Sequence, residues 1–203
     1  MKHTLTAAIL ALCMHPIAQA QTEPSAVTKT TVVIEDKSCP GLTISFNASG
    51  NDVEDVLKEE IKRNDGKSRS SSGFIVGRGI TIKQFSEKEQ DIYWKLKSKG
   101  RKKKEIVTVT MAVRNPDGSC LSDAQYNDSY TSTYAWLSAL PHKVDVYKKD
   151  QELEALRKQL KKVTNDLKDL QGNTSDQRRA YGRKSKELKE LEEKIDKLQK
   201  QNR

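Results

Sequence analysis

The sequence has few of the residues on which most catalytic and metal sites depend. Its 203 residues include three histidines and three cysteines, and aromatic residues make up 5%. After the first 20 residues the chain has one histidine, His142, and one histidine cannot form an HExxH zinc site or a histidine-rich metal cluster. The chain also lacks a G-x-S-x-G motif and a Walker-type phosphate loop. We therefore expect no cofactor and no bound metal, and we favour a protein that is not an enzyme.

Long apolar runs are missing as well. The apolar segment at residues 4–13, TLTAAILALC, is too short to cross a bilayer. It follows a short basic start and precedes the small residues of AQA, a pattern that predicts a secretory signal peptide over residues 1–20. Cys13 would suit a lipoprotein signal, but Leu12 stands where such signals normally have a small residue, so lipid anchoring is the weaker alternative. We expect an exported protein, periplasmic or secreted, with no transmembrane segment after cleavage.

Two cysteines follow this segment, Cys39 and Cys120, in the turn-like contexts KSCPG and PDGSC. They are too far apart in the sequence for a CxxC redox pair. In an oxidising compartment two cysteines can pair, and a disulfide that closes so long a loop would stabilise the fold by roughly 3–4 kcal/mol. We predict the Cys39–Cys120 disulfide, with two separate thiols as the alternative.

The rest of the chain divides by composition into a polar leader at residues 21–28, a domain at 29–142 and a Lys- and Glu-rich tail at 143–203. Within the domain, β-rich or alternating apolar segments predict strands, and the polar stretch at 64–73 predicts a loop. Gly77 and Gly79 indicate a bulge in one of these strands. The predicted strands are 31–35, 41–47, 74–85, 91–97 and 105–114.

Two helices are expected in the domain. The first begins at Asn51, which with Glu54 resembles a capping box, and its apolar residues share one face. The second begins after the N-cap residue Ser122 and ends or kinks before Pro141. The order of elements predicts an α+β domain, with a small antiparallel or mixed sheet and helices on one face.

The tail has apolar residues spaced by three and four, which predicts a C-terminal coiled coil. The predicted seam is Leu153, Leu156, Leu160, Val163, Leu167, Leu170, Tyr181, Leu188, Leu191, Ile195 and Leu198. The pattern weakens at residues 169–182, where Gly172 is a typical helix stop and Thr174 with Gln177 a capping-box start. We therefore prefer a helical hairpin to one long helix. If the tail were one long helix in a parallel dimer, the polar residues Thr174, Gln177 and Lys184 would occupy the seam of that dimer.

The formal net charge is +9. For an exported protein this charge indicates either a solvated Lys-rich surface or a contact with acidic envelope polymers or lipid head groups; nucleic acid is not expected as a partner. The basic loop consists of Lys97, Lys99, Arg101, Lys102, Lys103 and Lys104, and it is either an anionic-ligand contact or a solvated hairpin tip. Tyr126, Tyr130 and Tyr134 repeat every four residues and form either an exposed aromatic ridge that stacks on sugars or an aromatic face packed on the sheet.

The segments DVEDVLKEEIK (52–62) and DIYWKLK (91–97), followed by the Lys/Glu/Leu tail, resemble exported Bacteroidota proteins of unknown function. This resemblance implies an exported small domain with a helical tail and brings no established activity.

Three functions remain open. The first is a structural or interaction module that self-associates or binds a protein partner through its tail. The second is a binding module for an anionic or glycan envelope ligand, through the basic loop and the Tyr-rich helix. The third is an enzyme with a carboxylate site, for which EKEQD (87–91) and NDVEDVLKEE (51–60) offer acids, although acids at this spacing usually form a solvated helix face. We favour the first.

Overall fold

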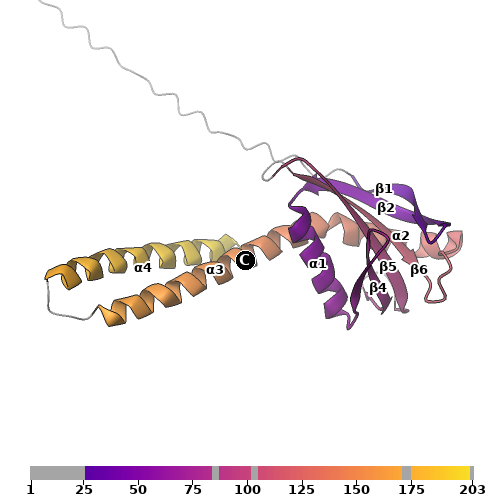
Figure 1. Ribbon diagram of the computed structural model, residues 1–203. Coiled ribbons are helices and arrows are strands. Elements are labelled where there is room, and N and C mark those ends of the chain that lie inside the picture. Colours follow the sequence, from indigo (N-terminus) through magenta and orange to yellow (C-terminus); the bar gives the residue numbers. More distant parts are fainter. Residues whose placement is uncertain (1–25, 84–86, 102–104, 171–174, 202–203) are drawn as a thin grey trace, which may run out of the picture.

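The computed structural model describes residues 26–83, 87–101, 105–170 and 175–201. In these segments an antiparallel six-stranded sheet packs against helices, and two long C-terminal helices extend away from it (Figure 1). The predicted α+β class is therefore confirmed, and the sheet is antiparallel rather than mixed.

The order of the strands across the sheet is β1-β2-β6-β5-β4-β3, so β6 lies between the hairpin β1–β2 and the meander that precedes it in the chain. The five predicted strands are all present, although β4 ends earlier than expected. A register shift between Gly77 and Ile80 confirms the predicted bulge in β4. The strands are β1 (Thr28–Ile34), β2 (Lys37–Asn47), β3 (Ser68–Ser71), β4 (Phe74–Ile80), β5 (Gln90–Lys99) and β6 (Ile106–Arg114).

Strand β3 was not predicted, because the sequence analysis assigned residues 64–73 to a loop. All four residues of β3 are exposed. They pair with β4 through the backbone, from Ser68 opposite Gly77 to Ser71 opposite Phe74. A strand at the sheet edge that buries no side chain leaves no alternation of apolar and polar residues in the sequence, which explains the error.

The helices are α1 (Gly50–Arg63), α2 (Asp123–Ser138), α3 (Leu140–Asp169) and α4 (Ser175–Gln201). Ser122 caps α2 as predicted, and its hydroxyl accepts a hydrogen bond from the Gln125 amide while the Gln125 side chain accepts one from the Ser122 amide. The break before Pro141 is also confirmed, since α2 ends at Ser138 and α3 begins with Pro141 in its first turn.

The predicted start of α1 was wrong. The N-cap residue is Ser49, whose side chain makes no capping hydrogen bond, and Asn51 already lies inside the helix. The Gly50 amide instead donates to the carboxylate of Glu105, at 3.0 Å. Glu105 comes from the segment between β5 and β6, so the cap is supplied by a residue distant in the sequence and no local motif could reveal it.

The main core lies between the sheet and α1, α2 and the first turns of α3. Alternate residues of β2, β5 and β6 face this core, and the indole rings of Trp94 and Trp136 pack with centroids 6.1 Å apart. Val53, Leu57 and Ile61 of α1 are fully buried there, as their helical spacing predicted.

A second, smaller apolar cluster covers part of the opposite face of the sheet. It contains Val32, Ile34, Cys39, Phe74, Val76, Tyr93 and Ala112. Glu35, in the turn between β1 and β2, forms ion pairs with Arg114 of β6 (3.0 Å) and Arg78 of β4 (3.6 Å). Because β2 and β4 are separated by two strands, these contacts show that the sheet curves toward this face and encloses the second cluster.

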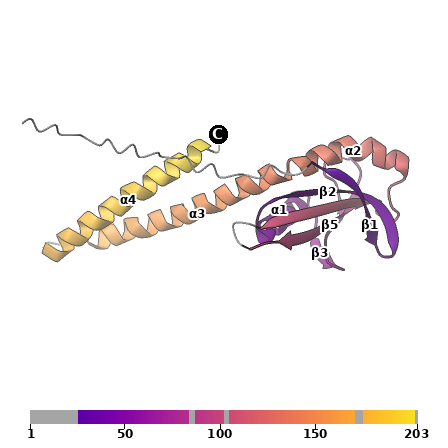
Figure 2. The ribbon, with the colours of Figure 1, turned by 90° about the horizontal axis from the view of Figure 1, so that it is seen from above.

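Helices α3 and α4 lie side by side and antiparallel (Figures 1 and 2). The Lys184 ammonium lies 3.3 Å from the Asp166 carboxylate near the far end of the pair, and Lys149 donates to the Gln201 carbonyl at 3.5 Å near the domain. We call residues 148–170 and 175–201 the helical arm. In the parts of the chain that the structure describes, no helix is both long and apolar enough to cross a membrane.

Candidate interaction surface

The helical arm is anchored in the core of the domain by the first two turns of α3. Leu140 and Val144 are buried in the main core, with exposed fractions of 0% and 1%. We call the first two turns of α3, residues 140–147, the root of the arm. Because α3 continues without interruption from the root to Asp169, the packing of the root sets the direction of the arm.

A partly buried ion pair fixes the same root to α1. The Lys143 ammonium lies 3.2 Å from the Glu60 carboxylate and 4.7 Å from the centroid of the Trp136 ring. Glu60 is 6% exposed. One turn further along α3, the Tyr147 hydroxyl donates to Asp55 at 3.3 Å. The pKa of Tyr147 is raised, first by desolvation and then by the negative charge of Asp55.

Glu60 and Lys143 are not among the site residues predicted from the sequence. A signal was present, because Glu60 falls within the apolar stripe of α1 beside Leu57 and Ile61. A carboxylate at such a position is buried, and a buried carboxylate is normally paired. The sequence could not show that its partner would come from a helix 83 residues further along the chain.

The residues of the predicted seam differ in how far they are buried. Val163 and Leu191 are buried, and Tyr181 is exposed at 43%. The remaining positions are half-buried: Leu153, Leu156, Leu160, Leu167, Leu170, Leu188, Ile195 and Leu198. Gly172 and Thr174, which were expected to stop one helix and start the next, lie outside the described residues.

Lys184 occupies a seam position that the heptad pattern left without an apolar residue. Its ammonium bridges Asp166 of α3 at 3.3 Å and Glu187 of α4 at 3.0 Å. These partners raise the pKa of Lys184, Glu187 first and Asp166 second. The interruption of the leucine pattern therefore coincides with an ion bridge between the two helices.

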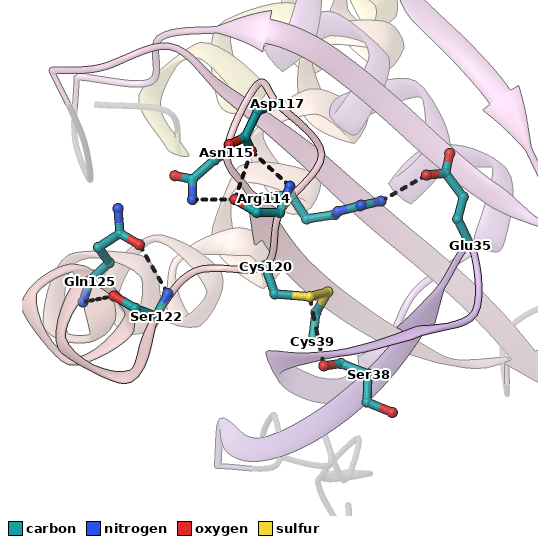
Figure 3. The surroundings of a disulfide bond; sticks show 10 residues. Glu35, Ser38, Cys39, Arg114, Asn115, Asp117, Cys120, Ser122 and Gln125 are labelled. Carbon is teal, nitrogen blue, oxygen red and sulfur yellow. Dashed lines mark hydrogen bonds and ion pairs between the residues drawn. A yellow bond between two sulfur atoms is a disulfide. The ribbon is translucent and has the colours of Figure 1, made fainter.

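The predicted disulfide joins Cys39 of β2 to Cys120, with the two Cα atoms 5.3 Å apart (Figure 3). Cys120 precedes the capping box of α2 by two residues, so the bond ties the start of α2 to the sheet. Close by, the buried Arg114 pairs with Glu35 and lies 5.7 Å from the centroid of the Tyr93 ring. The sequence analysis did not predict this arginine, which interrupts no pattern because it ends β6.

The three tyrosines of the predicted aromatic ridge are half-buried, and they pack against the main core. Successive ring centroids are 5.9 Å apart, and the Lys29 ammonium lies 4.4 Å from the centroid of the Tyr130 ring. The Tyr126 hydroxyl donates to the Gly41 carbonyl, and burial is the main cause of the raised pKa of Tyr126. The rings of Tyr126, Tyr130 and Tyr134 are thus engaged with the domain along much of their surface.

The basic loop lies at the hairpin between β5 and β6. Lys97, Lys99 and Arg101 are exposed there. Lys102, Lys103 and Lys104 lie outside the described residues. Across the described segments, no group of three or more His, Cys, Asp or Glu side chains is placed to hold a metal ion. His142 lines a shallow groove between α1 and α3, with Glu59, Arg63 and Val146 among its neighbours.

Comparison with other sequences adds no family to this description. No protein-family model matches the chain, and no curated protein matches it significantly. What the protein does must therefore be inferred from its own residues.

Proposed function

We propose that this protein is an exported, non-enzymatic interaction module of the cell envelope, in which the helical arm presents a binding surface at a fixed distance from the α+β domain. The observation that carries this proposal is the continuity of α3. One helix of 30 residues begins inside the main core and ends at the far end of the arm. At 1.5 Å per residue it spans about 45 Å, and of its residues only Leu140, Val144 and Tyr147 belong to or pack against the main core.

The root of the arm supports a rigid attachment. Leu140 and Val144 fill the core, while Lys143 pairs with Glu60 and Tyr147 with Asp55. Side chains that are packed and hydrogen-bonded at a helix root transmit orientation, because several bonds must break together before the helix can swing. An element that only linked two flexible parts would not require them.

The finer form of the proposal is that α3 and α4 make an intramolecular coiled-coil hairpin. A fold-back near residue 175 would place Leu160 opposite Leu191 and Leu156 opposite Ile195. The observed contacts Asp166–Lys184 and Lys149–Gln201 agree with this register to within one residue. Knobs-into-holes packing of the seam would explain why Val163 and Leu191 are its most buried members.

Export is supported by the pattern of residues 1–20 and by the Cys39–Cys120 disulfide. Disulfides persist in oxidising compartments and are rare where thiols are kept reduced. The resemblance to exported Bacteroidota proteins points in the same direction, and we propose a periplasmic or secreted location without a lipid anchor.

A second candidate is a binding module for an anionic envelope ligand at the basic loop. The exposure of Lys97, Lys99 and Arg101 favours it. The aromatic part of that hypothesis is weaker, because Tyr126, Tyr130 and Tyr134 pack on the domain and Lys29 already covers Tyr130.

The experiment that separates the two candidates is capture of partners from envelope extracts by the intact chain and by a chain that lacks residues 151–203. The truncation retains the residues of α3 that reach the core, since Val144 and Tyr147 precede the cut. Thermal unfolding of the truncated chain checks that the domain remains folded. We expect specific partners to be lost with the arm, and capture of the same set by both chains would contradict the proposal.

A further inference from the structure

Charge is distributed unevenly along the helical arm. Its distal half, residues 157–170 and 175–189, has eleven Lys and Arg against four Asp and Glu, a net charge of +7. Its near half, residues 148–156 and 190–201, has five Lys against seven Asp and Glu, a net charge of −2. Since the whole chain carries +9, most of the net positive charge lies at the end of the arm that is farthest from the domain (Figure 1).

These cations are open to solvent. Lys184 is half-buried in its ion bridge, and the other ten are exposed: Arg157, Lys158, Lys161, Lys162, Lys168, Arg178, Arg179, Arg183, Lys186 and Lys189. Lys158 pairs with Glu154 within α3. In the described part of the chain, Arg178, Arg179, Arg183 and Lys186 take part in none of the ion pairs. Arg179, Arg183 and Lys186 are spaced by four and three residues on α4. Like charges at this helical spacing repel one another, so an anionic partner would relieve the repulsion.

The first turns of α4 also carry a shallow, open groove on one helix. It is lined by Asp176, Arg179, Gly182, Arg183 and Lys186. Gly182 faces open space, because a Cβ atom at that position would meet no other atom within 4 Å. Among the described residues that line it, Asp176 is the one anion, against the three cations Arg179, Arg183 and Lys186. Guanidinium groups bind phosphate oxygens in pairs of hydrogen bonds, which suits such a groove to phosphate groups.

Two observations favour a surface of phosphate groups over a single linear polymer. The cations lie on both helices and on several faces of the arm rather than along one track. The negative near half would be repelled by an anionic surface, so the arm would meet that surface with its end. Tyr181 is exposed beside the cations, and tyrosine is enriched where a membrane meets water. In the described distal half it is the one large apolar side chain that is exposed, so binding would be peripheral.

We propose that the distal half of the helical arm binds the anionic head groups of a membrane surface. This inference rests on the proposed function, in which the arm is the interacting element of an exported protein, and it names the partner. Lys and Arg side chains near such a surface attract it within roughly a Debye length, about 10 Å at 0.1 M salt. The interaction is therefore sensitive to salt, and it places the α+β domain at a distance from the bilayer.

The test is sedimentation of the full chain, without its first 20 residues, with vesicles of phosphatidylcholine alone and of phosphatidylcholine mixed with phosphatidylglycerol. We compare the variant Arg179→Glu, Arg183→Glu, Lys186→Glu with the matched variant Lys97→Glu, Lys99→Glu, Arg101→Glu. Both change three exposed cations and the same net charge, and far-UV circular dichroism checks that both fold. The wild type should bind only the phosphatidylglycerol vesicles, and salt should release it.

The arm variant should lose affinity by roughly 100-fold or more, since three surface cations are reversed, while the loop variant should stay near the wild type. Equal losses in the two variants, or a larger loss in the loop variant, would overturn the inference in favour of the basic loop. Binding of the wild type to soluble polyphosphate or to an acidic polysaccharide, but not to vesicles, would overturn it in favour of a polymer. If vesicles are not bound while partner capture still requires residues 151–203, the membrane inference fails and the proposed function stands.

Discussion

The ammonium group of Lys184 in α4 lies 3.3 Å from the carboxylate of Asp166 in α3. The same group lies 3.0 Å from Glu187. In a fold-back register Asp166 approaches Glu187, and these like charges would repel without a cation between them. The residue that breaks the leucine pattern is therefore the one that compensates the charge at this level of the arm, which is why a polar residue is tolerated in the seam.

This bridge predicts a dependence of arm stability on pH. Asp166 and Glu187 raise the pKa of Lys184 above its ordinary value of 10.5. A raised pKa in the folded state contributes stability that is fully present below pH 10.5 and is lost as the pH rises through the higher, folded pKa. We expect the thermal midpoint of the arm to fall above this pH by more in the wild type than in Lys184→Met. Circular dichroism at 222 nm measures the thermal midpoint. If the midpoint depends on pH in the same way in the wild type and in Lys184→Met, the ion bridge does not stabilise the arm.

Removal of the disulfide should destabilise the domain. Cys39 and Cys120 close a loop with a sequence separation of 81 residues, for which the chain-entropy relation gives about 4.5 kcal/mol. We expect the variant Cys39→Ala, Cys120→Ala to unfold at clearly lower urea concentration than the oxidised wild type. Reduced wild type serves as the control and should behave like the variant. Equal midpoints for the oxidised and the reduced protein would show that the bond does not form in solution.

The ion pair at the root of the arm predicts non-additive substitutions. Lys143→Met leaves the Glu60 carboxylate, which is 6% exposed, without its partner and should cost about 2 kcal/mol of unfolding free energy. Glu60→Leu combined with Lys143→Met removes both charges and should recover most of this loss, because a buried pair replaced by apolar residues is often neutral. Urea unfolding of the two single variants and the double variant gives the coupling. Additive effects would mean that the pair does not hold α3 to α1.

The cap of α1 predicts an effect of a residue that no local motif identifies. The Glu105 carboxylate accepts a hydrogen bond from the Gly50 amide at 3.0 Å. Glu105→Ala should lower the unfolding free energy by about 1 kcal/mol, the usual size of an N-cap contribution. Asn51→Ala, at the position that the sequence analysis chose, is the matched control and should have little effect. A larger loss for Asn51→Ala would restore the capping box at that position.

The sequence was informative wherever one face of an element is buried. Alternation in β2, β5 and β6 and helical spacing in α1 predicted the residues that fill the main core. In the arm, the predicted seam includes the two buried residues Val163 and Leu191, whereas Tyr181 is exposed. β3 was missed because its residues bury nothing, and the cap of α1 because its partner is 55 residues away.

The pairs Glu35–Arg114 and Glu60–Lys143 could not be predicted for a related reason. The residues of the first pair are 79 positions apart in the sequence, and those of the second pair are 83 positions apart. Their proximity depends on the curvature of the sheet and on the crossing of α1 and α3, which are properties of the packed fold rather than of any short segment. The cations of residues 157–189 are contiguous in the sequence, but their position at the far end of the arm follows only from the antiparallel packing of α3 and α4.

The most direct test of this account is the distance between the two helices of the arm. Spin labels at positions 155 and 196 replace exposed residues, Ala155 and Asp196, which a fold-back near residue 175 brings to the same level. The native cysteines that follow residue 20 are paired with each other, so they do not react with the label. Labelled protein diluted with unlabelled protein removes distances between molecules. Because packed helix axes are roughly 8–10 Å apart, we predict a distance between the two labels below about 25 Å, measured by pulsed electron–electron double resonance. A distance of about 60 Å, the length of one uninterrupted helix between these positions, would contradict the account.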